Sequence, residues 1–365
     1  MESIFDTLSS QTVTVLPYFP IRQFAIRSVH WGAMPLTCEE VYLNCTQKKL
    51  KVVSLFIKPE SAYQYGMSSA EVAVRVFRSL ENEDLRILQV IETAMSKHEF
   101  VPQEQIADFA KLPRDRIDYQ LDKLNKLGLI YQTKGAYVGH TLNYAGYDCL
   151  AINAFVKAGM IEAFGHSLGV GKEADVYDAL TPKNVRVAVK FHRLGRISFR
   201  QTQRKRGYVK EHAGWLFQSR LAAEREFQAL KRVYAYGVAV PEPLSQNRHC
   251  IVMGMIDGAE LAKWRELPNP KKVLREVLRN VRKSYVKAGV IHADLSEYNV
   301  MVKDDQHILI IDWPQYVTLD HPNAAELLRR DLKNLLTFFT RRFRVNVKIE
   351  DAFDYVSGKS RSLTF

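Results

Sequence analysis

One short polar loop, followed by an apolar strand that ends in an acid, constrains the fold of this chain more than any other feature. Residues 290–299, Val-Ile-His-Ala-Asp-Leu-Ser-Glu-Tyr-Asn, place Asp294 and Asn299 five positions apart. The run Ile-Leu-Ile-Ile at 308–311 predicts a buried strand that ends at Asp312. Carboxylate and amide oxygens are ligands that Mg²⁺ prefers, and a carboxylate can orient or deprotonate a hydroxyl group. The pattern therefore predicts phosphoryl transfer, with Asp294 as catalytic base and Asn299 and Asp312 as metal ligands.

A lysine and a glutamate upstream supply further parts of such a site. Val-Ala-Val-Lys at 187–190 closes a β-branched strand, where the V-A-I-K pattern carries the lysine that contacts the α- and β-phosphates. Glu226 follows Lys190 by 36 residues on a predicted helix and is its expected ion-pair partner. Glu224 is the alternative partner, but apolar residues after Glu226 favour an inward-facing position there.

A glycine turn precedes this strand. Gly169 and Gly171 would let backbone N–H groups approach phosphate oxygens, and Lys172 adds a positive charge. The stretch follows the kinase pattern G-x-G-x-x-G-x-V, with Ala174 at the third glycine, whereas the P-loop pattern fails because His166 stands at its first glycine. A structural hairpin turn is the simpler interpretation of the glycines alone. The order of turn, lysine, helical glutamate, polar loop and strand-terminal acid favours a nucleotide site.

The chain also departs from the protein-kinase pattern. Ala293 replaces the arginine of H-R-D, Asp312-Trp313-Pro314 replaces D-F-G, and no A-P-E follows. Only 53 residues follow Asp312 in the 365-residue chain. We expect these to be too few for an activation segment and a full helical lobe that seats peptides. An ATPase, an autokinase or a kinase of small molecules is therefore expected.

The segment 76–158 predicts a winged helix-turn-helix domain. Apolar residues at helical spacing predict three helices, with Ile106 and Phe109 facing inward from the second, then a hairpin and a fourth helix. Winged helices bind nucleic acids or dock proteins, and the net charge of +12 favours an anionic partner. The third helix is expected to present five polar side chains to phosphates or groove edges: Arg114, Arg116, Gln120, Lys123 and Lys126.

The rest of the composition excludes several classes of protein. The four cysteines include no C-x-x-C pair, so neither a disulfide framework nor a zinc site is expected. No stretch approaches 18 consecutive apolar residues, and no basic segment precedes an apolar core at the N-terminus. We therefore expect a soluble intracellular protein. Residues 1–75 carry no chemical motif and are expected to be an extension. The alternative is an upstream start chosen in error, since Met67 lies shortly before the first periodic element.

In these motifs the chain resembles the RIO-type atypical serine/threonine protein kinases, and within them the type-two branch. That branch joins an N-terminal winged helix to a small kinase domain. The matching stretches are residues 84–102, 142–147, 169–177, 190–200, 292–299 and 311–323. The resemblance implies an α+β fold, in which an N-terminal winged helix-turn-helix precedes a truncated two-lobed protein-kinase-like domain. The expected divisions are an extension at 1–75, the winged helix at 76–158, the RIO kinase domain at 159–345 and a tail at 346–365.

The resemblance also implies a function. It implies an Mg²⁺/ATP-dependent enzyme that acts mainly as an ATPase, with autophosphorylation, in late maturation of the small ribosomal subunit. Asp312 is implied to accept phosphate transiently as an aspartyl-phosphate. The implied partners are the pre-small ribosomal subunit, its rRNA and ribosome assembly factors, with no membrane. A monomer in the cytoplasm is expected, and an additional nuclear location stays open.

The same resemblance completes the expected site. The linker Met-Gly-Met-Ile at 253–256 joins the two lobes, with Gly254 where the family tends to be acidic, and its backbone is expected to bind adenine. Ala174 stands where the family has a serine, so one hydroxyl contact to phosphate is expected to be missing. The expected cofactor-binding residues are Gly169, Gly171, Lys172, Glu173, Lys190, Glu226, Met253, Met255, Ile256 and Ser296. The expected catalytic residues are Lys190, Asp294 and Asp312, and the expected metal ligands are Asn299 and Asp312.

A basic loop follows the strand that carries Lys190. The family has a flexible loop at the position of residues 193–215, and here its cations are Arg193, Arg196, Arg200, Arg204, Lys205, Arg206 and Lys210. Interleaved aromatic residues favour rRNA contact over an ordinary solvated charge run. Two other functions stay open. One is a phosphotransferase of the aminoglycoside or choline kind, which shares a similar polar loop, and the other is a catalytically idle RNA-binding scaffold.

Overall fold

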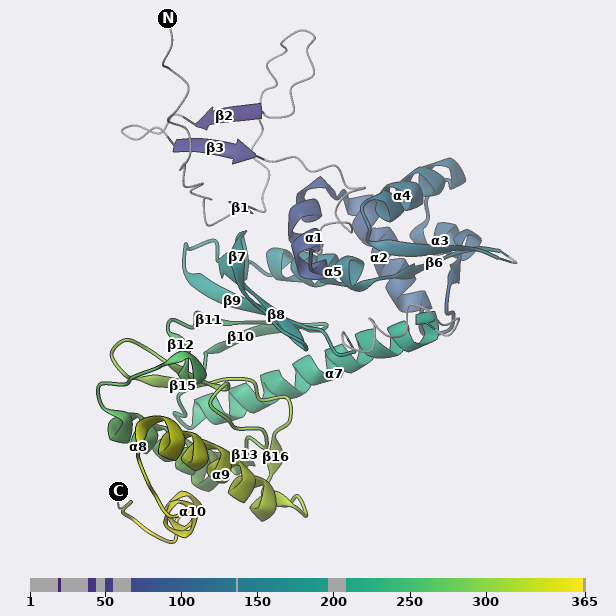
Figure 1. Ribbon diagram of the computed structural model, residues 1–365. Helices are drawn as coiled ribbons and strands as arrows, with labels where there is room; N and C mark the ends of the chain where they lie inside the picture. Colours follow the sequence, from purple (N-terminus) through teal and green to yellow (C-terminus); the bar gives the residue numbers. More distant parts are fainter. Residues whose placement is uncertain are drawn as a thin grey trace, which may run out of the picture.

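The computed structural model describes residues 19–20, 39–43, 50–54, 67–135, 137–195 and 208–363. Three parts follow one another in the chain (Figure 1): a helical unit with a small sheet, a six-stranded antiparallel sheet with one long helix, and a mainly helical C-terminal part. Strands β2 (Glu39–Leu43) and β3 (Leu50–Ser54) pair with each other in a separate sheet. The fold is α+β, as the sequence predicts.

The first part is a winged helix. Its elements are α1 (Ser69–Val76), η2 (Phe77–Ser79), α2 (Asn82–Ala94), β4 (Val101–Pro102), α3 (Gln103–Ala110), α4 (Arg114–Lys126), β5 (Ile130–Lys134), β6 (Val138–Leu142) and α5 (Tyr144–Lys157). The hairpin β5–β6 and the short β4 form the sheet β4-β6-β5. A capping box starts α2, because the Asp84 carboxylate accepts a hydrogen bond from the Glu81 amide at 2.8 Å.

One detail of the predicted winged helix is wrong: Phe109 is 65% exposed, so it does not face inward from α3 as predicted. Helix α1 begins at Ser69, before the predicted start of the domain at residue 76, and its buried Ala70, Val72 and Ala73 share a core with the winged helix. An eight-residue helix with small apolar residues has too short a pattern to be told from a loop by periodicity.

The second part is the sheet that carries the glycine turn. Its strand order is β1-β7-β8-β9-β11-β10. The strands are β1 (Phe19–Pro20), β7 (Ala163–Val170), β8 (Ala174–Leu180), β9 (Arg186–His192), β11 (Cys250–Gly254) and β10 (Pro243–Asn247). Helix α7 (Tyr208–Ala235) packs against β9, β10 and β11 and continues toward the C-terminal part (Figure 1).

One hydrophobic core joins the winged helix to this sheet. Ile152 and Phe155 of α5 belong to the same buried cluster as Phe164, Val189 and Phe191 of the sheet. Polar contacts cross the same interface: the Tyr144 hydroxyl donates to the Leu194 carbonyl at 2.9 Å, and Arg248 pairs with Glu92 at 2.6 Å. Burial of shared apolar surface is the main stabilising term in such an interface, so the two parts form one packed unit.

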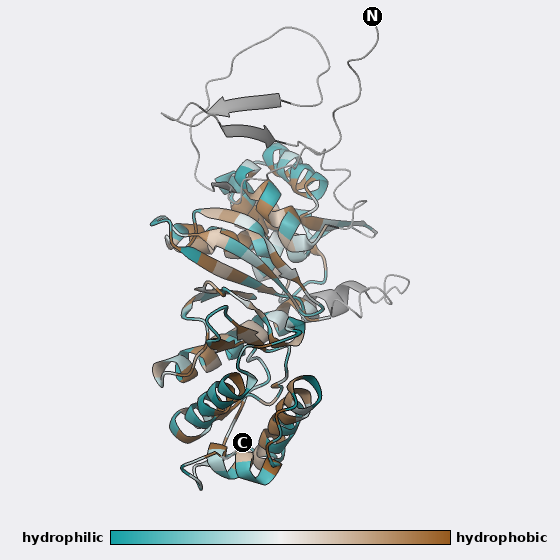
Figure 2. Ribbon diagram, turned by 60° about the vertical axis from the view of Figure 1, so that its left-hand side comes forward, coloured by the Kyte–Doolittle hydropathy of each residue, from teal (hydrophilic) through white to brown (hydrophobic). Residues whose placement is uncertain are grey.

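The third part has its own core and ends the chain. Its elements are β12 (Ala259–Glu260), η3 (Leu261–Lys263), α8 (Pro270–Lys283), η4 (Ser284–Ala288), β13 (Val290–Ile291), β14 (Val300–Val302), β15 (Ile308–Ile310), β16 (Val317–Thr318), α9 (Ala324–Phe343) and α10 (Ile349–Ser357). Asn269 caps α8 before Pro270, the position where a helix tolerates proline best. The helices carry hydrophobic and hydrophilic sides (Figure 2), and their apolar residues form the second large cluster. Among the helices described, none has an apolar stretch that could span a bilayer.

Candidate active site

Three charged side chains from distant segments meet between the sheet and the C-terminal part. The Lys190 ammonium on β9 donates to both carboxylate oxygens of Glu226 on α7, at 2.8 and 2.7 Å. It also donates to Asp312, which follows β15, at 2.7 Å. The Glu226 side chain is buried, whereas that of Asp312 is 41% exposed. The structure thus brings together the predicted pair Lys190–Glu226, while Glu224 instead pairs with Arg220 at 2.9 Å.

The electrostatics of this cluster keep its members charged. Burial alone would raise the pKa of Glu226, but the Lys190 charge and a hydrogen bond from His192 outweigh burial and lower the pKa to about 2. Burial alone would lower the pKa of Lys190, but the Asp312 and Glu226 carboxylates raise it instead. A buried cation held between two carboxylates is suited to exchange one of them for the phosphates of a nucleotide.

The polar loop after β13 holds the predicted base at the surface of the site. Asp294 is exposed, and the Asn299 side-chain amide donates to the Asp294 carbonyl at 2.9 Å. Ala293 and Asp312 both have positive φ, 63° and 69°, in a region that non-glycine residues seldom occupy. Such strain persists only where surrounding contacts impose it, and it is concentrated at functional sites. The Ile311 amide donates to the Asn299 carbonyl at 3.0 Å and ties the loop to the strand end.

A buried aspartate on α9 fixes the backbone of this loop. Asp331 is 1% exposed, and its two carboxylate oxygens accept hydrogen bonds from the Ala293 and Leu295 amides, at 2.8 and 3.1 Å. These amides flank Asp294 on both sides. Arg330 donates to the Ala293 carbonyl in the same place. Burial raises the pKa of Asp331 from 3.8 to about 7, although the two amides act to lower it.

This shift predicts a pH-dependent contribution to stability. Between about pH 4 and about pH 7, Asp331 in the unfolded chain loses its proton while the folded group keeps it. The unfolded state then binds fewer protons, so this residue makes the free energy of unfolding fall as pH rises through that window. Because an asparagine side chain cannot titrate, the Asp331→Asn variant should lose less stability over the same range, as measured by urea unfolding at several pH values. Equal losses of stability in the wild-type protein and Asp331→Asn as pH rises would contradict the raised pKa of Asp331. Asp304→Asn, which changes an exposed turn, is the control.

The glycine turn lies between β7 and β8. The Gly171 amide donates to the Ala174 carbonyl at 2.8 Å, and a Cβ at Gly171 would meet that oxygen at 3.2 Å. Lys172 and Glu173 are exposed at the tip of the turn. The Glu173 carbonyl accepts a hydrogen bond from the Arg193 amide at 2.6 Å, which attaches the turn to the end of β9. The predicted phosphate-binding residues thus lie on a turn anchored beside the Lys190 strand.

The predicted adenine-binding linker borders a small apolar cluster. Met253 is buried with Ala188, and Met255 and Ile256 pack against the same cluster. Ala188 and Lys190 are two residues apart on β9, so their side chains point to one face of the sheet. A Cβ at Gly254 would meet Glu242 at an ordinary contact distance of 3.4 Å, so the backbone does not require glycine there.

The donor set at the predicted metal site fits a hard cation. Asn299 uses its side-chain N–H to reach the Asp294 carbonyl, which leaves its amide oxygen as the atom that could bind a metal. The partly exposed Asp312 carboxylate adds oxygen ligands of the kind that Mg²⁺ prefers. Ser296 lies on the same loop, and its carbonyl oxygen accepts a hydrogen bond from the backbone amide of Asn299 at 3.1 Å.

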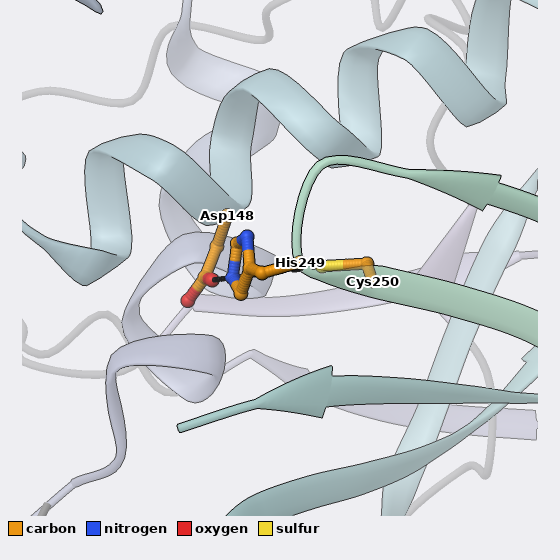
Figure 3. A group of neighbouring side chains, drawn as sticks. All are labelled: Asp148, His249 and Cys250. Carbon is orange, nitrogen blue, oxygen red and sulfur yellow. Dashed lines mark hydrogen bonds and ion pairs between the residues drawn. The ribbon is translucent and has the colours of Figure 1, made fainter. Parts of the chain in front are cut away.

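A second group of potential ligands is a closed hydrogen-bonded cluster. Among the described residues, Asp148, His249 and Cys250 place ligand atoms within 4.8 Å of one another (Figure 3). All three are buried, the His249 Nε2 donates to Asp148 at 2.6 Å, and burial raises the pKa of the Cys250 thiol. Metal binding by cysteine requires a thiolate, so this cluster does not favour a metal. Cys149 is also a buried free thiol, and the two other cysteines lie outside the described residues.

The predicted nucleic-acid surface on α4 is largely neutralised by acids of α2. Gln120 is fully buried and donates to Glu83 at 3.1 Å, so the prediction that it is exposed is wrong. Arg116 pairs with Glu83 at 2.7 Å, and Lys123 pairs with Asp84 at 2.6 Å. Helical periodicity cannot show which charges a neighbouring helix supplies. The predicted cations of α4 that are exposed and form no ion pair within the described part of the chain are Arg114 and Lys126.

The second predicted RNA-contacting surface falls mainly outside the structure described. Of residues 193–215, those at 196–207 lie outside the described ranges, and so do the side chains of 208–213. Arg193 is an exception that departs from the prediction. It is 1% exposed and pairs with Asp148 at 2.7 Å, so it is a buried structural cation and not part of an RNA surface.

Sequence reasoning missed three residues that the structure places around the site. They are His192, Arg193 in its buried role, and Asp331. A signal exists for each of them. His192 ends β9 and Arg193 follows it, two polar residues directly after the buried Phe191. Asp331 stands on the apolar face of α9 beside Leu328 and Leu332.

The chain is similar to known proteins over most of its length. A family model described as RIO domain matches residues 175–352, and one described as Rio2, N-terminal matches residues 77–158. The RIO-type serine/threonine-protein kinase Rio2 of Methanocaldococcus jannaschii is 38% identical over 275 residues, which are 72% of this chain and 100% of that protein. The serine/threonine-protein kinase rio2 of Schizosaccharomyces pombe is 35% identical over 274 residues, 74% of this chain and 79% of that protein.

A solved structure shares the architecture. The crystal structure of the Rio2 kinase-ADP/Mg²⁺-phosphoaspartate complex from Chaetomium thermophilum matches with a TM-score of 0.67 and 33% identity. The match covers 78% of this chain and 89% of that one.

Proposed function

Because the chain belongs to the RIO family of atypical serine/threonine protein kinases, in its Rio2 branch, we propose that it binds Mg²⁺ and ATP and acts mainly as an ATPase on precursors of the small ribosomal subunit. The observation that carries the ATPase part is the assembled group of Lys190, Glu226 and Asp312 beside an exposed Asp294. Kinase membership argues against an idle RNA-binding scaffold and against a kinase of amino sugars or choline.

The roles of the residues follow from their contacts. Lys190, held by the buried Glu226, exchanges its contact with Asp312 for the α- and β-phosphates when the nucleotide binds. The Asp312 carboxylate is then released, and with Asn299 it would hold Mg²⁺, which neutralises phosphate charge when bound. Asp294 orients or deprotonates the attacking water molecule or hydroxyl group.

Asp312 is also the acceptor that we propose for transient phosphorylation. Its carboxylate is partly exposed and sits at a strained backbone position beside the lysine. The related Chaetomium thermophilum structure contains a phosphoaspartate with ADP and Mg²⁺. In this transfer an Asp312 carboxylate oxygen would bond to the γ-phosphorus as the bond from that phosphorus to the ADP oxygen breaks. Water, oriented or deprotonated by Asp294, would then hydrolyse the aspartyl-phosphate and release inorganic phosphate, so that ATP can turn over without a bound peptide.

The ribosomal part of the proposal rests on charge and family. The net charge of +12 and the basic run within residues 193–215 support binding to rRNA, which is a polyanion. Family membership supports binding to pre-small ribosomal subunits and their assembly factors. A monomeric state and a cytoplasmic location, with access to the nucleus left open, belong to the same proposal.

Affinity purification of the tagged Asp294→Ala protein tests the ribosomal part directly. If ATP turnover drives release, this variant should retain more precursor rRNA of the small subunit than the wild-type protein does. Sequencing of the bound RNA measures the difference, with Asp304→Ala, which removes an exposed carboxylate, as the matched control. Absence of small-subunit precursors from both proteins would contradict the ribosomal role.

A further inference from the structure

His192 lies between the active site and the winged helix, with both ring nitrogens engaged. It is 3% exposed. Its Nδ1 lies 3.1 Å from the His249 carbonyl oxygen, and its Nε2 lies 2.7 Å from a Glu226 carboxylate oxygen. A carbonyl and a carboxylate are both acceptors, so each ring nitrogen must carry a hydrogen to make these contacts. Both ring nitrogens of His192 are therefore placed to donate.

The His192 side chain would help to orient the glutamate that holds the phosphate-binding lysine. One Glu226 oxygen is shared by Lys190 and His192, each at 2.7 Å. The other oxygen accepts from Lys190 at 2.8 Å and faces the Trp313 amide at 3.4 Å. The Glu226 carboxylate is thus fixed from both sides. Of its two side-chain partners, Lys190 is the one proposed to contact the phosphates, and His192 is the other.

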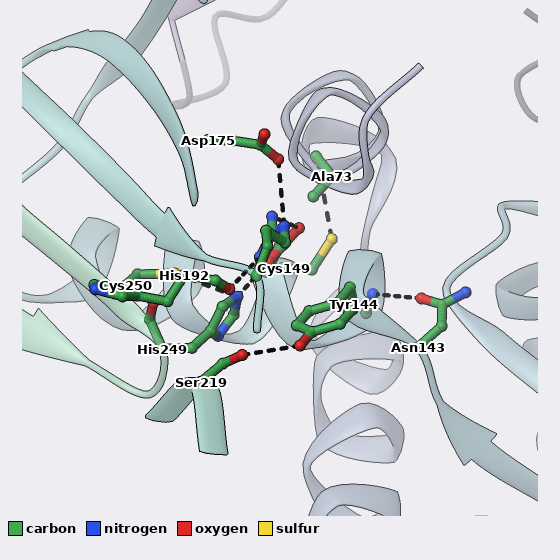
Figure 4. A network of polar contacts seen from close by, with 12 residues as sticks. Ala73, Asn143, Tyr144, Cys149, Asp175, His192, Ser219, His249 and Cys250 are labelled. Atoms are coloured by element: carbon green, nitrogen blue, oxygen red, sulfur yellow. Dashed lines mark hydrogen bonds and ion pairs between the residues drawn. The ribbon is translucent and has the colours of Figure 1, made fainter. Parts of the chain in front are cut away.

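Contacts from the winged helix hold His192 in turn (Figure 4). The His249 carbonyl oxygen accepts hydrogen bonds from the backbone amide of His192, at 2.9 Å, and from the His192 ring. The His249 ring donates to Asp148 of α5 at 2.6 Å and stacks on Tyr147 of α5, with centroids 4.5 Å apart. The second Asp148 oxygen accepts from Arg193 at 2.7 Å, and Arg193 donates to the His192 carbonyl at 3.2 Å.

We propose that His192 is a positioning residue for the Glu226–Lys190 pair, and that Asp148 of the winged helix sets its position through His249 and Arg193. The winged helix is then part of the support for the nucleotide site, in addition to any role in binding a partner. This inference rests on the proposed binding of Mg²⁺ and ATP at Lys190.

Two amide substitutions separate the two contacts of the ring. In His192→Gln the side-chain amide nitrogen lies about where Nε2 lies in histidine, so it can still donate to Glu226. In His192→Asn the amide nitrogen lies about where Nδ1 lies, so it can donate to the His249 carbonyl but does not reach Glu226. We expect the asparagine variant to bind Mg·ATP about 10- to 100-fold more weakly than the glutamine variant, the value of one hydrogen bond to a charged group. Calorimetric titration of the purified full chain measures both constants, with thermal melting to confirm folding and His307→Gln, an exposed histidine, as the control.

The outcomes distinguish the inference from the proposed function. Equal affinities of the two variants, or tighter binding by the asparagine variant, would overturn the positioning role. Failure of the wild-type protein to bind Mg·ATP would instead overturn the proposed function.

A second variant tests the link to the winged helix. Asp148→Asn removes the carboxylate that accepts hydrogen bonds from His249 and Arg193, so it should weaken Mg·ATP binding by about 10-fold. Unchanged affinity in Asp148→Asn would overturn the link to the winged helix.

Discussion

Replacing Asp294 by alanine is expected to slow ATP turnover by about 10²- to 10⁴-fold, the usual contribution of a positioned base. Nucleotide affinity should change little, because Lys190 and Glu226 form their pair without Asp294. The loop should keep its conformation, since Asp331 and Asn299 hold its backbone. Steady-state phosphate release gives the turnover rate, and equilibrium titration gives the affinity.

A matched carboxylate removal makes this result interpretable. Asp304→Ala changes an exposed aspartate on the turn between β14 and β15, close to Asp294 in sequence but outside the loop. It should leave turnover at the wild-type rate. Equal turnover in wild type and Asp294→Ala would show that Asp294 is not the base.

Replacing Arg193 by methionine is expected to lower the free energy of unfolding by about 3–5 kcal/mol. The guanidinium is 1% exposed and lies within ion-pair distance of two buried carboxylates, Asp148 at 2.7 Å and Asp175 at 3.3 Å. Methionine fills a similar volume but leaves both carboxylates buried near each other without their cation. Removing one member of a buried ion pair lowers the free energy of unfolding several-fold more than removing one member of most surface ion pairs.

Urea unfolding measures this loss, and a surface arginine provides the control. Arg220 pairs with Glu224 at 2.9 Å, and both side chains are exposed, at 51% and 40%. Arg220→Met should therefore cost about 1 kcal/mol or less. A loss below about 1 kcal/mol in Arg193→Met would contradict the view that this cation joins the winged helix to the sheet.

Most of the site could be predicted from local patterns. Lys190 closes a β-branched strand, Asp312 ends an apolar run, and Asp294 lies in a loop of recognisable spacing. The ends of such elements can be predicted from the period and chemistry of a few residues. Glu226 could also be chosen over Glu224, because the apolar residues after it mark the inward face of a helix, and Glu226 is buried in the structure.

The errors have a common cause. Arg116 and Lys123 look like free cations of a helix, but acids of α2 pair with them. Phe109 looks like a core residue, yet the fold leaves it 65% exposed because nothing packs over that side of α3 in the described part of the chain. In each case the deciding partner lies on another element, and periodicity along one element does not reveal it.

The sequence by itself determined the α+β class, the order of the winged helix and the kinase-like part, and the residues with the chemistry of phosphoryl transfer. Only the tertiary structure decided which charges are buried and paired. Asp148 and His192 are far apart in sequence, and no local pattern connects them. Both side chains are buried in the same region, so their hydrogen-bond partners are the residues packed against them. Because an unpaired buried charge is costly, packing dictates which groups must meet, and it connects the winged helix to the lysine of the active site.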